Sequence, residues 1–205
     1  MPIKPEREYR KIDIGNLETR DDEMIVEGYA TTFNEPYLLF RENKYAVYEQ
    51  VDPSAFERTD MTDVIFQYDH QGRVFARNKN GTLEISTDEH GLKIRANLGG
   101  TEEGRKLYEE IKGGYTDKMS FGFTVRGDKR ETTENKETGE TRIDRIITDV
   151  GKLYDVSAVS IPANDATEIS ARSVSEGAIA DAVKEINAEE ERQRKLKLLK
   201  LMLGV

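Results

Sequence analysis

Residues 118–126 read Lys-Met-Ser-Phe-Gly-Phe-Thr-Val-Arg, an alternating pattern that predicts a β-strand. Successive side chains of a strand point to opposite faces, which separates the large apolar residues from the small or polar ones: Met119, Phe121 and Phe123 against Ser120, Gly122 and Thr124. We expect the aromatic face to point to the core. The other face is either an ordinary polar exterior or, because glycine leaves space beside Ser120, a place for a substrate backbone.

The same alternation recurs along the chain and predicts further strands at 23–33, 45–51, 64–68, 74–77, 82–86, 92–98, 142–149 and 152–161. Asn80-Gly81 predicts a hairpin turn that joins two of them, 74–77 and 82–86. One helix is expected over 101–114, where Thr101 is the N-cap. The fold class is therefore mainly β with flanking helices (α+β). A closed or nearly closed β-barrel of seven or more strands would remove the exposed strand edges.

The last part of the chain has a different pattern. Residues 127–141 are almost wholly polar and predict a long hairpin loop. Pro162-Ala163-Asn164 is expected to end the last strand, and 166–173 to form a linker. This divides the chain into a barrel domain, residues 1–172, and a charged helical tail, residues 173–205, that we expect to be dispensable for folding. The tail ends in apolar residues that would be exposed unless something covers them: Leu196, Leu198, Leu199, Leu201, Met202 and Leu203.

Composition argues against several classes of protein. The chain has 205 residues, a net charge of −9 and no cysteine. A protein that binds duplex nucleic acid needs a basic face, so we expect no nucleic-acid partner. Without cysteine there is no disulfide and no thiolate ligand, and two histidines make a poor zinc site, so we expect no metal and no other cofactor. Membrane contact is not expected, because no apolar run reaches the ~18 residues of a span and the N-terminus lacks a secretion signal.

Few residues are candidates for chemistry at neutral pH. His70 ends an apolar strand, whereas His90 lies in an acidic turn and is interpreted as a surface residue. Ser120 stands out among the serines because of its strand, and no Gly-x-Ser-x-Gly motif is present. Asp155 lies in an apolar strand, where it either faces solvent or is buried with a partner such as His70. Asp69 is an alternative acid, although strand neighbours point to opposite faces.

These residues, in this order, resemble the prohead proteases of tailed bacteriophages, which are serine peptidases of capsid maturation related in fold to herpesvirus assemblin. The resemblance runs from about Glu27 to Ala166. It is carried by an ordered set of short motifs: Glu27-Gly28-Tyr29-Ala30, Phe33-Asn34, Ala55-Phe56, Asp69-His70, Gly91-Leu92, the helix at 101–114, Met119-Ser120-Phe121-Gly122-Phe123, Asp155-Val156-Ser157 and Pro162-Ala163-Asn164.

The resemblance implies that Ser120 is the nucleophile, His70 the general base and Asp155 the orienting acid, at a position where the family more often has Glu. A base that must be neutral implies activity that rises through roughly pH 6–7. The implied substrates are the scaffold or N-terminal segment of the major capsid protein and the chain itself. Whether the chain pairs with a second copy as a homodimer is left open. The implied location is the assembling prohead in the host cytoplasm. The alternative, from another class, is a non-catalytic capsid scaffold or assembly protein with the same fold.

Overall fold

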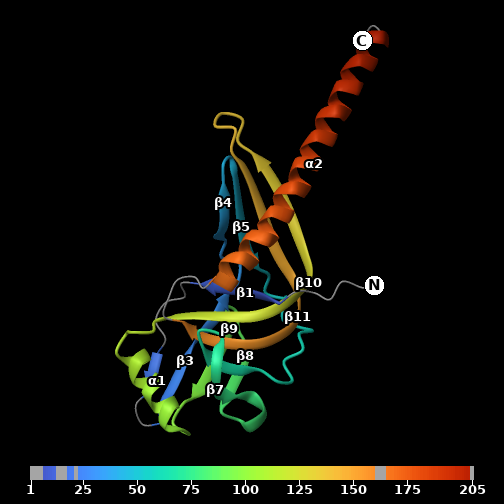
Figure 1. The fold of residues 1–205 in the computed structure, drawn as a ribbon. Helices are drawn as coiled ribbons and strands as arrows, with labels where there is room; N and C mark the ends of the chain where they lie inside the picture. Colours follow the sequence, from blue (N-terminus) through green and yellow to red (C-terminus); the bar gives the residue numbers. More distant parts are fainter. Residues whose placement is uncertain (1–6, 13–17, 21–22, 160–164, 204–205) are drawn as a thin grey trace.

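The computed structural model describes residues 7–12, 18–20, 23–159 and 165–203, which form two β-sheets and two α-helices (Figure 1). In chain order the elements are β1 (Glu8–Ile12), β2 (Glu18–Arg20), β3 (Ile25–Thr32), β4 (Tyr37–Glu42), β5 (Tyr45–Val51), β6 (Ile65–Tyr68), β7 (Gln71–Arg77), the 3₁₀ turn η1 (Asn78–Asn80), β8 (Leu83–Thr87), β9 (Gly91–Asn97), α1 (Glu102–Lys112), β10 (Lys118–Glu134), β11 (Thr141–Val159) and α2 (Asp165–Leu203).

The two sheets form a body and an arm (Figure 1). The larger, seven-stranded sheet has the order β1-β10-β11-β5-β4, with β6 paired to β11 and β7 paired to β6. The smaller sheet has the order β2-β3-β9-β8. In Figure 1, β10 and β11 sweep from the lower body, which holds the smaller sheet and α1, up into an arm formed with β4 and β5.

The β-rich class with helices is confirmed, but the predicted barrel is wrong, because neither sheet formed by the described residues closes on itself. The cause is β11, which pairs in parallel with β5 through Thr141–Ile147 and with β6 through Asp155–Ala158. The sheet therefore divides at β11 into a branch with β5 and β4 and a branch with β6 and β7. Only the second branch belongs to the body (Figure 1). β1, β4 and β7 are left at the edges of the sheet.

The main core packs β10 and β11 against β3, β9 and α1, which confirms that the aromatic face of β10 points inward. Phe121 and Phe123 are fully buried, and their rings stack with centroids 4.4 Å apart. The predicted helix is confirmed as α1. The Thr101 side chain accepts a hydrogen bond from the Gly104 N–H at 3.0 Å, which caps the first turn, and Leu107 is buried on the inner face.

The predicted hairpin around Asn80-Gly81 is wrong, because β7 pairs with β6 whereas β8 pairs with β9 in the other sheet. The side chain of Asn78 accounts for the change of partner. Its Oδ1 accepts from the Val64 N–H at 3.0 Å, and its Nδ2 donates to Met61 O at 2.6 Å. These bonds tie η1 to the segment before β6, so that the chain passes from one sheet to the other.

The predicted loop at 127–141 is also wrong, since β10 continues to Glu134, which pairs with Thr141. Only 135–140 remain as the connection at the tip of the arm. Ion pairs with neighbouring strands stabilise this polar part of β10. Asp128 accepts from Arg145 at 2.6 Å, and the Arg145 side chain is buried between β10, β5 and β1. Strands β1, β2 and β4 had no counterpart among the predicted strands.

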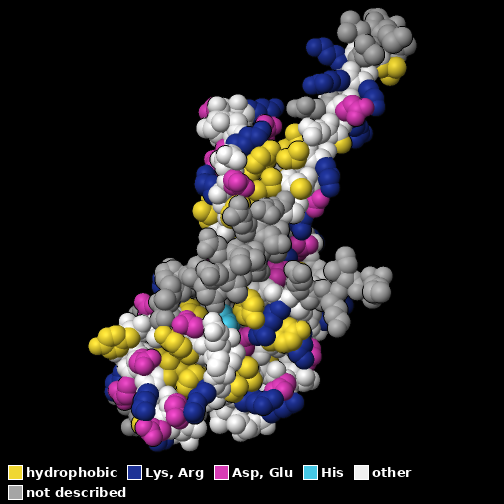
Figure 2. All heavy atoms as spheres, in the orientation of Figure 1, with side chains coloured by type: hydrophobic (Ala, Val, Ile, Leu, Met, Phe, Trp, Pro, Cys, Tyr) yellow, Lys and Arg dark blue, Asp and Glu magenta, His cyan; other side chains and the backbone are white. Residues whose placement is uncertain are grey.

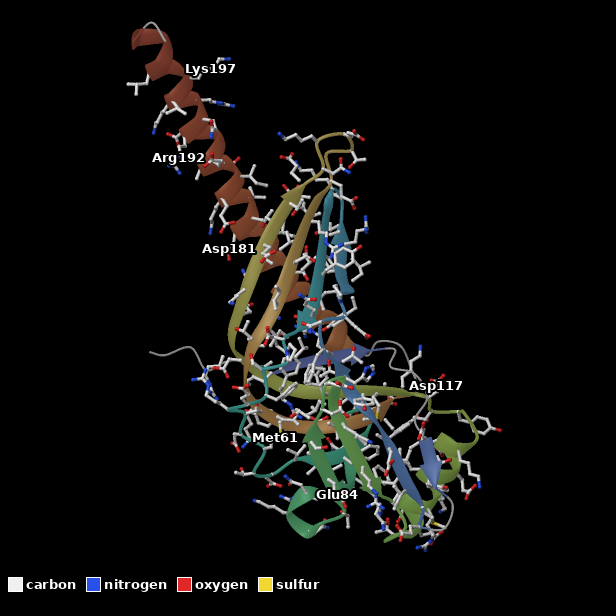
Figure 3. The ribbon with its side chains drawn as sticks, turned by 180° about the vertical axis from the view of Figure 1, so that it is seen from behind. Met61, Glu84, Asp117, Asp181, Arg192 and Lys197 are labelled. Carbon is white, nitrogen blue, oxygen red and sulfur yellow. The ribbon has the colours of Figure 1, made fainter. Side chains whose placement is uncertain are left out.

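α2 is a helix of 39 residues that leaves the body beside the arm (Figure 1). It includes the predicted linker 166–173, so that prediction is wrong, and the predicted strand end at Pro162-Ala163-Asn164 lies outside the described residues. Further along, charges of both signs cover the helix (Figure 2), and Asp181, Arg192 and Lys197 follow one another away from the sheets (Figure 3). Leu196 and Leu199 are 47% and 55% exposed. Within the part of the chain that the structure describes, neither helix contains an apolar stretch that could span a bilayer.

The first half of α2 belongs to the arm, which changes the expected effect of truncation. Ala178 and Ala182 are buried against Val47 and Ile143. A chain that ends after Asn187 keeps these contacts and is expected to melt within about 2 °C of the full chain. A chain that ends after Ser173 exposes the apolar patch and is expected to melt roughly 5–10 °C lower. Circular dichroism melts of the two chains measure this, and equal melting temperatures would return the tail boundary to residue 173.

Candidate active site

His70 is placed by a tight turn between β6 and β7. Asp69 and His70 have positive φ angles of 47° and 57°, and Tyr68 pairs with Gln71. Two consecutive left-handed residues are typical of a type I′ hairpin turn, a conformation that costs energy in residues other than glycine. The Asp69 N–H donates to Ala158 O at 3.0 Å and holds the turn against β11. The strained turn thus aims the imidazole at the strands that carry Ser120 and Asp155.

The register between β10 and β11 sets the positions of the serine and the acid. Ser120 lies opposite Ser157, and Gly122 opposite Asp155, so these four residues share one face. A register shift follows directly, because Phe123 pairs with Leu153 rather than with Tyr154. This bulge places Asp155 on the face opposite to that of Leu153, whereas regular alternation would put the two side chains on one face. Asp155 is therefore fully buried on the same side as Ser120.

Hydrogen bonds connect the three side chains in the order Ser120, His70, Asp155. Ser120 Oγ lies 2.5 Å from Nε2 of His70, and Nδ1 of His70 is hydrogen-bonded to Oδ2 of Asp155. When the Nδ1 proton faces the carboxylate, Nε2 can accept the proton of the Ser120 hydroxyl. The geometry therefore provides a hydroxyl, a base within reach and an acid that orients the base.

Ser157 is a fourth member of the site, to which the sequence analysis gave no role. Its hydroxyl donates to Oδ2 of Asp155 at 2.9 Å and lies 3.2 Å from Nδ1 of His70. It is fully buried, so its hydrogen bond helps to fix the carboxylate. The available signal was its spacing, since a serine two residues beyond an acid in one strand lies on the same face.

Gly122 makes room for the acid rather than for a substrate backbone. A Cβ atom on Gly122 would clash with Oδ1 of Asp155 and lie 2.9 Å from Nε of Arg7. The interpretation of an open polar face beside Ser120 is thus wrong, because Asp155 and Arg7 fill that space. Arg7 forms an ion pair with Oδ1 of Asp155.

Gly122→Ala is expected to displace Asp155 and lower peptide cleavage by about 10-fold or more, with roughly 1–3 kcal/mol of lost stability from overpacking. Gly127→Ala is the matched control in the same strand, because its Cβ would meet Asp149 Cβ at an ordinary 3.4 Å. Cleavage rates and melting temperatures of both variants test this. Equal rates would show that the acid does not depend on the close approach.

Burial and, as a smaller effect, the positive charge of Arg7 together lower the pKa of His70 from 6.5 to about 4. The charged and titratable groups around the ring are Asp155 from β11 and, from the N-terminal segment (residues 7–12), Arg7 and Tyr9. His70 is therefore neutral at physiological pH, which is the state that a general base requires.

The pKa shift moves the expected pH dependence. A neutral His70 is needed for Ser120 to react, so the rate is low below the pKa and reaches a plateau above it. We now expect the midpoint near pH 4 rather than at pH 6–7. Arg7→Gln removes the positive charge and is expected to move the midpoint to higher pH. The rate at which a fluorophosphonate labels Ser120, followed from about pH 3.5 to 8, measures both. An unchanged or lower midpoint in Arg7→Gln would contradict the role of this charge.

The remaining candidates lie elsewhere or have other roles. His90 is in the turn between β8 and β9, where its ring packs on Tyr29 with centroids 4.5 Å apart. Asp69 is in the turn that carries His70, and its backbone bonds to β11. Within the described residues, no group of His, Asp and Glu side chains is arranged to hold a metal ion.

The family of the chain follows from a comparison with known protein families. The sequence model of the family described as caudovirus prohead serine protease matches residues 10–180. The chain belongs to this family. The match to the prohead serine proteases includes His70, Ser120 and Asp155 and the first part of α2. Membership makes the protein a serine peptidase of capsid maturation.

The bacteriophage T4 capsid assembly protease, gp21, is a similar solved structure, with a TM-score of 0.42 and 15% sequence identity over 78% of this chain and 100% of that chain. No curated protein sequence gives a significant match to this member of the prohead serine protease family.

Proposed function

We propose that the protein is a serine endopeptidase that cleaves the scaffold or N-terminal segment of the major capsid protein, and itself, inside the assembling prohead in the host cytoplasm. Ser120 is the nucleophile, His70 the general base and Asp155 the orienting acid. The observation that carries this proposal is the hydrogen-bonded series from Ser120 Oγ through His70 to Asp155 Oδ2. The peptidase family of the chain supports the same reading.

The reaction follows from the atoms that meet at the site. Nε2 of His70 takes the Ser120 proton while Oγ bonds to the carbonyl carbon of the peptide. The C–N bond then breaks, and the departing amine takes the proton from Nε2. Water, activated by the same nitrogen, releases the acid and restores Ser120. Asp155 stabilises the imidazolium, and Ser157 holds the carboxylate in position.

The test uses the full chain together with the major capsid protein. We expect defined fragments of the capsid protein and a shortened form of the chain, both found by intact-mass spectrometry after prolonged incubation. A serine-directed fluorophosphonate should prevent both and should be recovered on the peptide that contains Ser120. A chelator should have no effect. Intact proteins and an unlabelled Ser120 would instead favour the non-catalytic scaffold.

The exposed end of α2 is proposed to deliver the peptidase to the shell by binding a capsid-protein helix. Leu196 and Leu199 present apolar surface there, within a strongly charged helix. A chain that ends after Asn187 should therefore cleave peptides but fail to enter proheads. Entry at the normal level would remove this role from the tail.

A further inference from the structure

The triad is closed to solvent in this structure. Ser120 is 1% exposed, and the side chains of His70 and Asp155 are 5% and 0% exposed. A peptide cannot reach Oγ of Ser120 unless some element moves. That element is the N-terminal segment, because β1 pairs antiparallel with β10 from Met119 to Phe123 and places Lys11 directly opposite Ser120.

The N-terminal segment touches each member of the triad. The carbonyl oxygen of Arg10 lies 2.7 Å from Oγ of Ser120, so the hydroxyl proton has two acceptors within reach, this oxygen and Nε2 of His70. The ring of Tyr9 meets the His70 ring edge-on, with centroids 4.6 Å apart. Arg7 pairs with Asp155 and lies over the Tyr9 ring at 4.9 Å. One short segment therefore covers the nucleophile, the base and the acid together.

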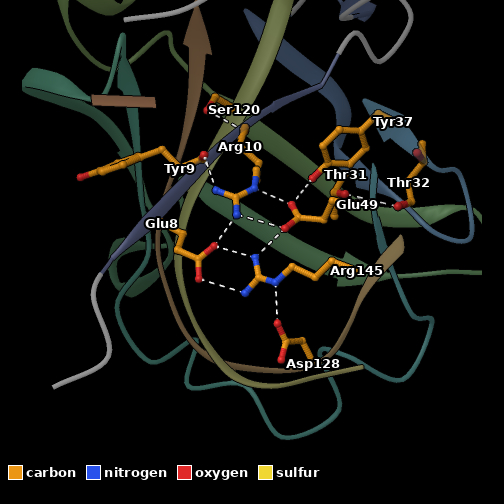
Figure 4. Close-up of polar contacts among 10 residues, drawn as sticks. All are labelled: Glu8, Tyr9, Arg10, Thr31, Thr32, Tyr37, Glu49, Ser120, Asp128 and Arg145. Carbon is orange, nitrogen blue, oxygen red and sulfur yellow. Dashed lines mark hydrogen bonds and ion pairs between the residues drawn. The ribbon is translucent and has the colours of Figure 1, made fainter. Parts of the chain in front are cut away.

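The opposite face of β1 is held by a buried cluster of charges (Figure 4). The Arg10 guanidinium bonds to both carboxylate oxygens of Glu49 on β5 and to Glu8. Arg145 bonds to the same two acids. Burial alone would raise the pKa of Glu49, but the two guanidinium groups lower it to about 2, so Glu49 is charged. A buried carboxylate of this kind needs a cation beside it.

The position of β1 is the position that a substrate would need. One side of β10 is paired with β11, so an extended peptide can add to β10 beside Ser120 only on the side that β1 holds. A peptide lying there would present one carbonyl group to Ser120, as Arg10 does. The side chain of that residue would then point to Glu49, again as Arg10 does.

We propose that β1 occupies the substrate position and keeps the site closed, and that the peptide which replaces it carries Arg or Lys at the attacked carbonyl, with Glu49 as the residue that selects it. This inference rests on the proposed peptidase function. In the reaction, Ser120 Oγ bonds to the carbonyl carbon of the basic residue, Nε2 of His70 takes the hydroxyl proton and returns it to the departing amine, and water hydrolyses the ester.

Closure is tested by the rate at which a fluorophosphonate labels Ser120 in the full chain. Arg10→Ala removes the cation through which β1 binds Glu49 and is expected to speed labelling by at least about 10-fold. Tyr9→Ala uncovers His70 without touching the charge cluster and should speed labelling as well, so the test survives if Arg10→Ala does not fold. Arg142→Ala is the matched control, because Arg142 pairs with Asp144 on the exposed part of the arm. Equal rates in the wild type, Arg10→Ala and Tyr9→Ala would overturn the proposal.

Selection is tested with quenched fluorescent peptides that have the sequence of residues 7–14 and Arg, Lys, Gln or Glu at the position of Arg10. We expect kcat/KM for Arg and Lys to exceed that for Gln and Glu by on the order of 10- to 100-fold. Glu49→Gln, with its melting temperature as control, should abolish this difference. A product of the full chain that begins at Lys11 also supports the proposal, since β1 is then cut as a substrate.

The outcomes separate this inference from the peptidase function. Equal cleavage of the four peptides, or a preference that survives in Glu49→Gln, overturns the selection by Glu49 but leaves a working peptidase. If no variant is labelled at Ser120 and no peptide is cut, the peptidase function itself fails.

Discussion

Ser120→Ala is expected to abolish peptide cleavage, a loss on the order of 10⁶-fold by comparison with other serine peptidases, while the protein keeps its fold. The substitution removes one hydroxyl group and adds no atom to a tightly packed strand. The lost hydrogen bond, which the hydroxyl donates to His70 or to the carbonyl oxygen of Arg10, costs roughly 1–2 kcal/mol. Full-length protein should then accumulate on expression, and the melting temperature should change by only a few degrees.

Ser157→Ala is the matched control, because Ser157 is a buried serine directly opposite Ser120 on β11. It donates one hydrogen bond to Asp155, so its loss is expected to slow cleavage by about 10-fold only. The two rates should be compared on purified proteins that are free of host proteases. If Ser120→Ala still cuts at the wild-type rate, or if Ser157→Ala is the inactive variant, Ser120 is not the nucleophile.

Asp155→Asn is expected to slow cleavage by up to about 10⁴-fold, by analogy with the same change in a triad of known mechanism. The amide keeps the shape of the side chain but loses the charge that holds the Nδ1 proton of His70 and stabilises the imidazolium. Because Asp155 also pairs with Arg7, the variant should lose stability as well. Single-turnover rates and melting temperatures separate the two effects.

Asp155→Glu tests charge against position. It keeps the carboxylate but must fit another methylene into the space left by Gly122, so we expect it to retain more activity than Asp155→Asn and less than the wild type. A rate that is unchanged in Asp155→Asn would remove this residue from the triad and turn attention to Asp69.

Much of the fold was predictable because alternation is a local property. The strands around 25–32, 45–51, 65–68 and 92–97 appear within a few residues of their predicted bounds, as does α1. The pairing of strands, by contrast, is not a local property of the sequence. The split of β11 between two partners and the change of sheet at Asn78 depend on contacts between segments that are distant in the sequence. The spacing of apolar residues along the sequence carries no information about such contacts, so the predicted barrel and the predicted hairpin were wrong.

The candidate site divides in the same way. His70 was a candidate because the chain has only two histidines. Ser120 was a candidate because its strand alternates large apolar residues with small or polar ones. The burial of Asp155 required the bulge at Tyr154, which alternation does not contain. Arg7, Arg10 and Glu49 were missed because charged residues in a charged chain carry no signal by themselves. Their meaning comes from the antiparallel pairing of β1 with β10, which brings residues 7–12 to the triad.

The base of α2 packs against β1, the strand that covers Ser120, while its far end stands away from the body (Figure 1). From Ala182 to Leu199 the helix advances about 25 Å at 1.5 Å per residue. α2 therefore connects the strand that closes the site with an exposed apolar end, and it packs on β4, β5 and β11 in between. A partner that binds the exposed end would be coupled to that strand through one continuous helix. Anchoring and opening would then be two results of one binding event, and a peptidase still free in solution would stay shut.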